Sequence, residues 1–150
     1  KCTPAHYEDG KCLAWNGKSF VRVTVSSAYR NPDYPVVCVT WYQARAYCRF
    51  RGKDLPSEAR WEYAARAGGK SVYAWGDTEP GEKLCANAQK RHPLQVGSFT
   101  QNNWGLYDMT GNAAEWCLDI YDNSYYEVAP AENPMGPESR GHADAQGPAP

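Results

Sequence analysis

Residues 39–66 read VTWYQARAYCRFRGKDLPSEARWEYAAR. This stretch contains two helical patterns, and each begins at a residue that suits an N-cap. Thr40, with a glutamine three residues later, forms a capping box, and Ser57 is the N-cap of the second pattern. Gly52 and Gly68 suit the left-handed position that ends a helix. The sequence therefore predicts two short helices joined by a tight turn.

Tryptophans mark the apolar faces of the two predicted helices. Trp41 shares its face with alanine and tyrosine, and Trp61 shares its face with two alanines. Because both faces need cover and lie close together in the sequence, we expect Trp41 and Trp61 to pack into one core. Glu62 and Arg66 lie one turn apart on the second helix, so we expect them to form an ion pair.

The rest of the chain predicts little regular structure. Residues 1–19 are rich in turn formers. Short strands are expected at residues 20–25, at residues 94–99, and in the segment that ends at Asp119. Residues 138–150 are rich in proline, glycine and alanine, and we interpret them as a disordered or extended tail. We therefore expect one α+β domain over residues 1–137.

The composition limits the classes of partner. The chain has 150 residues, 16 basic and 17 acidic side chains, and a formal net charge of −1. No run of like charge marks a surface for nucleic acid, so we expect no nucleic-acid partner. No stretch approaches the ~20 apolar residues of a membrane span, and no signal peptide begins at Lys1. An export signal would have been removed or would lie outside this chain.

Six widely spaced cysteines indicate an oxidising compartment. They form no C-x-x-C pair and no zinc-finger spacing. An even number in a small chain suits a disulfide framework, and free buried cysteines are the alternative. We therefore expect an extracytoplasmic location. The 15 pairings of six cysteines stay open. Local pairing is our hypothesis, Cys2 with Cys12, Cys38 with Cys48, and Cys85 with Cys117.

Several motifs, in order along the chain, resemble the formylglycine-generating enzyme, or sulfatase-modifying factor, family. They are residues 39–66, the YAWGD of residues 73–77, the VGSF of residues 96–99, the GLYDMTGNAAEW of residues 105–116 and the NPMGP of residues 133–137. The resemblance implies the C-type-lectin-like fold of that family, an α+β body with two short helices, short strands and many long loops. The family's N- and C-terminal segments are expected to be missing here.

The same resemblance implies oxidase activity only for chains that contain the family's copper(I)-binding pair of cysteines. The family carries this pair in a C-terminal segment after N-P-x-G-P, and no cysteine follows Cys117 here. Ala114 stands where the family motif has an active-site tryptophan, so we expect no copper on this chain. The family also has arginine at the position of Asp54 and glutamate at the position of Arg60.

The family's calcium site is implied by the G-L-Y-D motif. Carried over residue by residue, its ligands would be the Asp108 and Glu115 side chains and the Gly111 and Ala113 carbonyls. A hard cation prefers oxygen ligands, and a glycine permits the backbone curl that turns carbonyls inward. The alternative is that the two carboxylates cap turns and pair with basic side chains.

Three tyrosines near the tail are candidates for a partner surface, namely Tyr121, Tyr125 and Tyr126, because an exposed aromatic cluster suits an interface. Our hypothesis is a non-catalytic, exported, calcium-stabilised module that binds another protein, alone or within a larger assembly, or serves a structural role. One alternative is a part of a copper-dependent formylglycine-generating oxidase whose catalytic cysteines lie outside this chain. The other is lectin-like carbohydrate binding.

Overall fold

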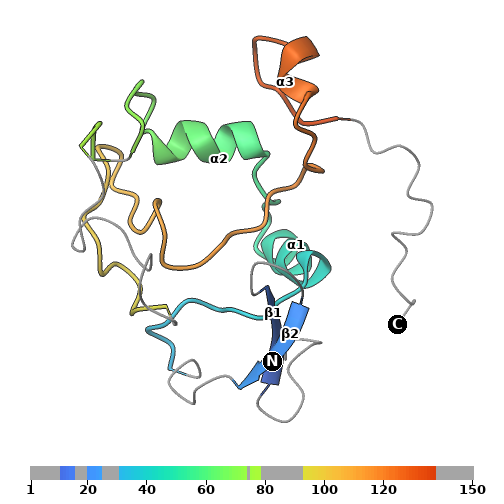
Figure 1. Cartoon of the computed structure of the whole chain (residues 1–150), viewed down its shortest axis with the longest axis vertical. Coiled ribbons are helices and arrows are strands. Elements are labelled where there is room, and N and C mark those ends of the chain that lie inside the picture. The colour runs from blue at the N-terminus through green and yellow to red at the C-terminus, as the bar shows by residue number, and fades with distance from the viewer. Residues whose placement is uncertain (1–10, 16–19, 25–30, 74, 79–92, 138–150) are drawn as a thin grey trace.

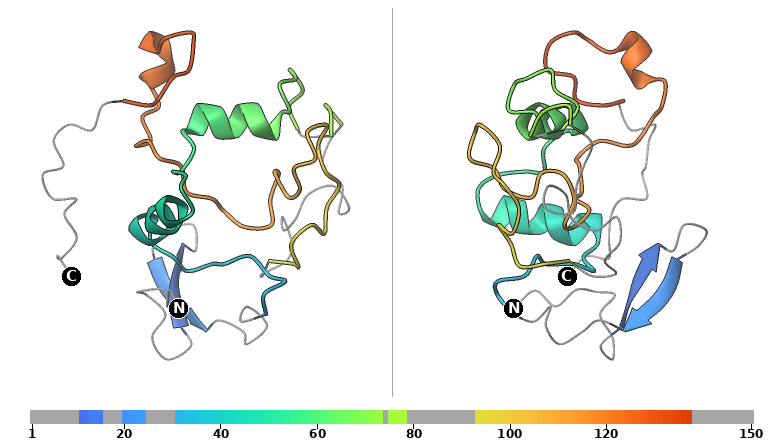
Figure 2. Two further views of the ribbon diagram at one scale, coloured as in Figure 1. Left: turned by 180° about the vertical axis from the view of Figure 1, so that it is seen from behind. Right: turned by 60° about the vertical axis from the view of Figure 1, so that its left-hand side comes forward.

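The computed structural model describes residues 11–15, 20–24, 31–73, 75–78 and 93–137. Its elements, in chain order, are β1 (Lys11–Trp15), β2 (Phe20–Thr24), α1 (Trp41–Phe50), α2 (Glu58–Ala65) and α3 (Tyr125–Val128). In Figure 1 the β1–β2 hairpin lies at one end, α1 lies between it and α2, and α3 lies at the opposite end. The long loops between these elements are also clear in Figure 2. The described part therefore has the sparse regular structure that the sequence predicts.

The two strands form an antiparallel pair in which Lys11 faces Thr24 and Trp15 faces Phe20. The strand predicted at residues 20–25 is confirmed and ends one residue earlier. Its partner β1 lies in a segment that the sequence assigned to turns. β1 contains no β-branched residue, so strand propensity does not indicate it, and pairing with β2 decides its conformation.

The predicted strands at residues 94–99 and before Asp119 are wrong, because no strand is found in the described residues beyond 24. Their amides find partners outside a sheet ladder. Val96 N donates to Asp33 O at 2.8 Å, and Leu118 N donates to Pro56 O at 2.8 Å. Contacts of this kind take the place of sheet pairing in these two segments. None of the helices described here is long and apolar enough to span a membrane.

Both predicted helix starts are confirmed. Gln43 N donates to Thr40 Oγ1 at 3.2 Å, and Thr40 N donates to Gln43 Oε1 at 3.0 Å, which closes the capping box of α1. Ser57 Oγ accepts from Arg60 N at 3.4 Å at the start of α2. Each cap satisfies amides that the first turn of a helix leaves without a partner.

Residues with left-handed backbone follow α1 and α2. Gly52 has φ 70° after α1, as predicted. After α2 the first left-handed residue is Ala67, with φ 50°, and the following Gly68 N donates to Tyr63 O at 3.0 Å. A side chain in this conformation costs about 1 kcal/mol relative to glycine. The end of α2 therefore lies one residue earlier than the glycine predicts.

The prediction that Trp41 and Trp61 share one core is wrong. α1 and α2 make no direct packing contact with each other. Instead, both indoles donate to one loop, Trp41 Nε1 to Cys117 O at 2.7 Å and Trp61 Nε1 to Glu115 Oε2 at 2.8 Å. An indole N–H needs an acceptor when its ring is covered, and this loop supplies acceptors to both helices.

The most buried residues of the described chain are mainly polar. Ser57 is fully buried, Asn102 is 4% exposed and Asn112 is 7% exposed. In the described part, the buried hydrophobic residues are Leu55 and Ala65, each 8% exposed. Because a buried polar group must be hydrogen-bonded, these three polar side chains are expected to hold segments of the chain together.

Candidate functional site

Asn102 ties the C-terminal end of α2 to the loop that follows it. Its Nδ2 donates to Ala64 O at 2.8 Å and to Ala65 O at 3.1 Å. Its Oδ1 accepts from Trp104 N and Leu106 N, both at 3.0 Å. One buried amide therefore satisfies two helix-end carbonyls and two loop amides. An Asx turn can be recognised from a sequence, but the distant acceptors of such a side chain cannot.

Asp108 and Asn112 organise the next part of the loop. The Asp108 carboxylate accepts from Gly97 N at 2.7 Å, Phe99 N at 3.2 Å and Asn112 Nδ2 at 3.1 Å. Asn112 Oδ1 accepts from Leu94 N at 2.8 Å. These two side chains thus fasten residues 94–99 to the loop, in place of the strand that the sequence predicted there.

A cavity of about 420 Å³ opens on this loop, and all four predicted calcium ligands line it. They are the carboxylate residues Asp108 and Glu115 and the carbonyl-bearing residues Gly111 and Ala113. Gly111 has φ 117°, so the backbone does curl in the region where the sequence required it. We refer to this site, between residues 108 and 115, as the loop cavity.

The oxygen donors of the loop cavity suit a hard cation, although they also serve the fold. Gly111 O accepts from Ala113 N at 2.9 Å, and Glu115 Oε2 accepts from the Trp61 indole. Each carboxylate oxygen can accept more than one bond, so these contacts leave room for a cation. No group of three or more His, Cys, Asp or Glu side chains suited to a metal occurs among the described residues. Carbonyl oxygens would therefore have to complete any coordination.

The three predicted partner-binding tyrosines line a second cavity, of about 390 Å³. Tyr121, Tyr125 and Tyr126 lie on α3 or on the chain just before it, and the Tyr125 and Tyr126 rings meet edge to face with centroids 5.5 Å apart. Tyr121 is 89% exposed. We refer to this site as the tyrosine cavity. The structure brings the predicted residues together, while their role in binding stays a prediction.

Acidic residues that the sequence did not indicate as a site also line the tyrosine cavity. Tyr126 OH donates a hydrogen bond to Glu58 Oε2, and Glu58 N donates to Asp119 Oδ1 at 2.8 Å. The bond to Glu58, aided by burial, raises the pKa of the Tyr126 hydroxyl well above its usual range. Glu58 belongs to α2, and no spacing rule connects it with residue 119 or 126.

The N-terminal end of α2 is also fastened to the NPMGP segment. Ser57 Oγ donates to Pro134 O at 3.2 Å, and Arg60 Nε donates to Asn133 Oδ1 at 3.0 Å. Gly136 lies so close to Asp119 that a Cβ on the glycine would meet the aspartate Cβ at 2.1 Å. Ser57 is therefore a structural residue. Arg60, which replaces the family's glutamate, gives up the capping-box acid and binds this segment instead.

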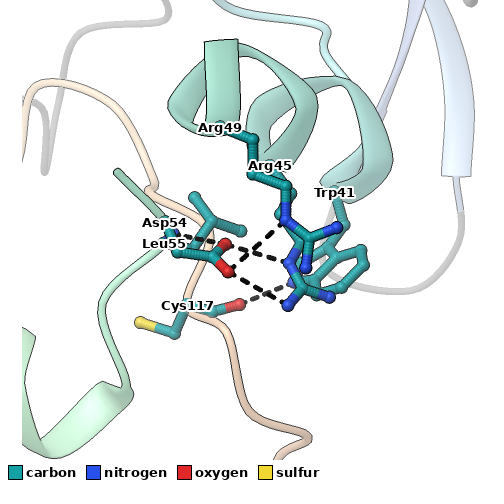
Figure 3. A network of polar contacts seen from close by, with 6 residues as sticks. All are labelled: Trp41, Arg45, Arg49, Asp54, Leu55 and Cys117. Carbon is teal, nitrogen blue, oxygen red and sulfur yellow. Dashed lines mark hydrogen bonds and ion pairs between the residues drawn. The ribbon is translucent and has the colours of Figure 1, made fainter. Parts of the chain in front are cut away.

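A separate polar network joins α1 to the turn before α2 (Figure 3). Asp54 accepts from Arg45 Nε at 2.9 Å and from Arg45 Nη2 at 3.1 Å, and it lies 3.5 Å from Arg49 Nε. The Arg45 hydrogen bonds lower the pKa of Asp54 to about 2. Arg45 also lies over the Trp41 ring, 5.1 Å from its centroid. The aspartate that departs from the family pattern thus has a structural partner, outside both cavities.

The cysteines correct part of the predicted disulfide pattern. Cys48 and Cys117 are free thiols, whereas Cys38 is disulfide-bonded. Two predicted pairs are therefore wrong, Cys38 with Cys48 and Cys85 with Cys117. A disulfide needs Cα atoms within about 7 Å, and separation along the chain does not determine that distance. The pair of Cys2 with Cys12 includes a residue outside the described part and stays a prediction.

Cys117 lines the tyrosine cavity but is poorly suited to act as a thiolate. Burial raises the pKa of its thiol, and the nearby carboxylates of Asp119, Glu58 and Glu115 raise it further. A nucleophilic or copper-binding cysteine requires the opposite shift. Ala114, where the family motif has tryptophan, is exposed.

Several known proteins are similar to this chain. It is 43% identical over 121 residues to the formylglycine-generating enzyme of Streptomyces coelicolor, covering 71% of this chain and 38% of that protein. It is 42% identical over 118 residues to the serine/threonine-protein kinase pkn1 of Chlamydia pneumoniae, covering 77% of this chain and 19% of the kinase. Among solved structures, PvdO from Pseudomonas aeruginosa matches with a TM-score of 0.55 and 31% identity, covering 71% of this chain and 44% of PvdO.

The chain thus spans less than half the length of these relatives. The sulfatase-modifying factor enzyme 1-like domain matches residues 10–147, which is nearly the whole chain. The ordered motifs from residue 39 to residue 137 agree with this match, and so does the loop-rich structure. The chain belongs to the sulfatase-modifying factor enzyme 1-like family.

Proposed function

We propose that this chain is an exported, non-catalytic domain of its family that binds another protein through the tyrosine cavity. The observation that carries the proposal is the convergence of Tyr121, Tyr125 and Tyr126 on one open cavity. Aromatic side chains that are exposed together favour contact with a partner. The alanine at position 114, where the family motif has an active-site tryptophan, supports a role without oxidation.

Calcium, in this proposal, stabilises the loop cavity. The Asp108 and Glu115 carboxylates and the Gly111 and Ala113 carbonyls would hold the ion, because all four residues line one cavity and offer oxygen. The ion would supply positive charge between two carboxylates. Asp108 already holds the amides of residues 97 and 99, so the residues that would bind the ion also join the loop to its neighbour.

The second candidate function is participation in a copper-dependent formylglycine-generating oxidase, with the catalytic cysteines outside this chain. Its support is the 43% identity to the Streptomyces coelicolor enzyme of that name. Lectin-like carbohydrate binding has no comparable support from the described residues and remains the weaker alternative.

An oxidation assay separates the first two candidates. The intact native protein that contains this chain is incubated with copper(I), oxygen and a sulfatase-type cysteine peptide, and the peptide mass is followed. We expect the cysteine to stay unchanged, while the Streptomyces coelicolor enzyme converts it to formylglycine in parallel. Formation of the aldehyde by the intact protein would overturn the non-catalytic proposal and favour the oxidase.

A further inference from the structure

The described lining of the tyrosine cavity includes an apolar, aromatic part, which we call its floor, and an acidic part, which we call its rim. Ile120 and three tyrosine rings line it, and the side chains of Tyr121 and Tyr126 are 89% and 54% exposed. A volume of about 390 Å³ accommodates one or two side chains of a partner but not a folded element. We therefore expect the cavity to bind small groups that can pack against the faces of aromatic rings.

The rim of the same cavity is acidic. Glu58, Asp119 and Asp122 line it, and no residue of its described lining is lysine, arginine or histidine. The hydrogen bonds that Glu58 and Asp119 accept come from neutral groups, the Tyr126 hydroxyl and the Glu58 amide. Within the described lining, no cation balances the Glu58 and Asp119 carboxylates, and a neutral or anionic partner would gain nothing from their charge.

We propose that the tyrosine cavity binds a basic side chain, lysine or arginine, presented by a segment of a partner protein. This inference rests on the proposed protein-binding function and specifies the chemistry of the partner. A cation gains from the carboxylates and also from the faces of tyrosine rings. The aliphatic stem of a lysine or arginine suits the floor formed by Ile120 and the rings.

The test compares two peptides that differ only in charge. Acetyl-Gly-Lys-Gly-amide and the same peptide with Nε-acetyllysine are titrated into the full chain, and amide shifts of residues 119–127 are followed by NMR. We expect the lysine peptide to bind with a Kd of about 1 mM and the acetylated peptide at least about tenfold more weakly. Equal binding of the two peptides, or no binding of either, would overturn the inference.

A matched pair of variants locates the charge. Glu58→Gln keeps an oxygen that can accept from Tyr126 OH, so the cavity keeps its shape while losing one carboxylate. We expect this variant to bind the lysine peptide about fivefold more weakly. Glu127→Gln on α3, which does not line the cavity, should bind as the native chain does. An equal loss in both variants, or no loss in Glu58→Gln, would contradict the assignment.

These outcomes are separate from those of the oxidation assay. If the protein prefers the lysine peptide and also forms aldehyde, the site for a basic side chain is supported and the non-catalytic proposal is wrong. If the protein forms no aldehyde and binds the two peptides equally, the non-catalytic proposal is supported and the site for a basic side chain is not there.

Discussion

Glu115 lines both the loop cavity and the tyrosine cavity. The contacts that fix the other lining residues differ between the two sites. Around the loop cavity, the Asp108 and Asn112 side chains bind the backbone amides of a neighbouring segment. The tyrosine cavity lies beside a four-residue helix, α3, which is fastened to α2 through Tyr126 and Glu58. The first site is organised by the half-buried Asp108 and the buried Asn112, and the second by aromatic rings, of which Tyr121 and Tyr126 are exposed.

This difference suggests different tasks. A site whose oxygen atoms are already fixed by hydrogen bonds suits a small ion, because little ordering remains to be done on binding. A site built from exposed rings and side-chain carboxylates suits a partner that supplies part of the buried surface itself. The comparison predicts that substitutions in the loop cavity chiefly affect stability, and that substitutions in the tyrosine cavity chiefly affect binding.

The largest effect is expected from Asn112→Ala. This change leaves the Leu94 amide without its acceptor and removes one of three donors to the Asp108 carboxylate, so we expect the free energy of unfolding to fall by about 3 kcal/mol. Urea unfolding measures it. Asn103→Ala, at an exposed asparagine of the same loop region, is the control and should change stability by less than ~0.5 kcal/mol. A similar loss in both variants would remove the contrast between the cavities.

Calcium should have the next largest effect. At about 100 times its Kd, the ion should stabilise the native chain by about 2.7 kcal/mol, and a chelator should remove that gain. Thermal melting with calcium and with chelator measures it. Asp108→Ala should melt lower in both conditions, because the carboxylate also binds two amides, and should show no calcium difference.

Glu132→Ala, which removes an exposed carboxylate outside the loop cavity, is the control for that experiment and should keep the full calcium response. If the native chain melts at one temperature in both conditions, the loop cavity does not bind calcium.

A smaller effect, seen at alkaline pH, concerns Tyr126. Its pKa is raised above that of the unfolded chain, so the Tyr126–Glu58 bond contributes stability fully below about pH 10. That contribution is lost as the pH rises through the folded-state pKa. Absorbance titration should show one tyrosine ionising later than the others, and Tyr126→Phe should remove this late phase.

Glu58→Gln should lower the pH at which Tyr126 ionises. The Glu58 carboxylate repels the ionised tyrosine oxygen, and the neutral glutamine amide does not. A late phase that persists in Tyr126→Phe would mean that another tyrosine is responsible and that α3 is not held as described.

The smallest effect on stability is expected from Tyr121→Ala. The ring is 89% exposed, so its removal should change the free energy of unfolding by less than ~0.5 kcal/mol. The same variant should bind the lysine peptide more weakly, because it removes part of the aromatic floor. A loss of more than about 2 kcal/mol in unfolding would show that the ring supports the fold, which would contradict the contrast between the two cavities.

Local signals were sufficient to predict α1 and α2, whereas the four-residue helix α3 was not predicted. The capping box at Thr40, the N-cap at Ser57 and the left-handed Gly52 are all confirmed. The expected Glu62–Arg66 ion pair is also present, with Arg66 Nη2 2.7 Å from Glu62 Oε1. These features involve residues within about four positions of each other, so sequence spacing contains most of the required geometry.

The predictions failed where a partner lies far along the chain. Trp41 and Trp61 bind the loop at residues 115–117 rather than each other, and the segment 94–99 bonds to side chains rather than to a strand. Burial of Asn102 was also missed. Each of these outcomes depends on which acceptor, far along the chain, bonds to a given donor. The residue pattern of a short segment does not determine that partner.

For the sites, the sequence by itself determined the candidate residues. Family motifs indicated Asp108, Gly111, Ala113 and Glu115, and exposed aromatic character indicated the tyrosines. Only the tertiary structure decided that these sets line two adjoining cavities, and that Glu58 of α2 joins the second. The physical reason is that local spacing specifies turns and helix caps, whereas long-range hydrogen bonds decide which charges and rings meet.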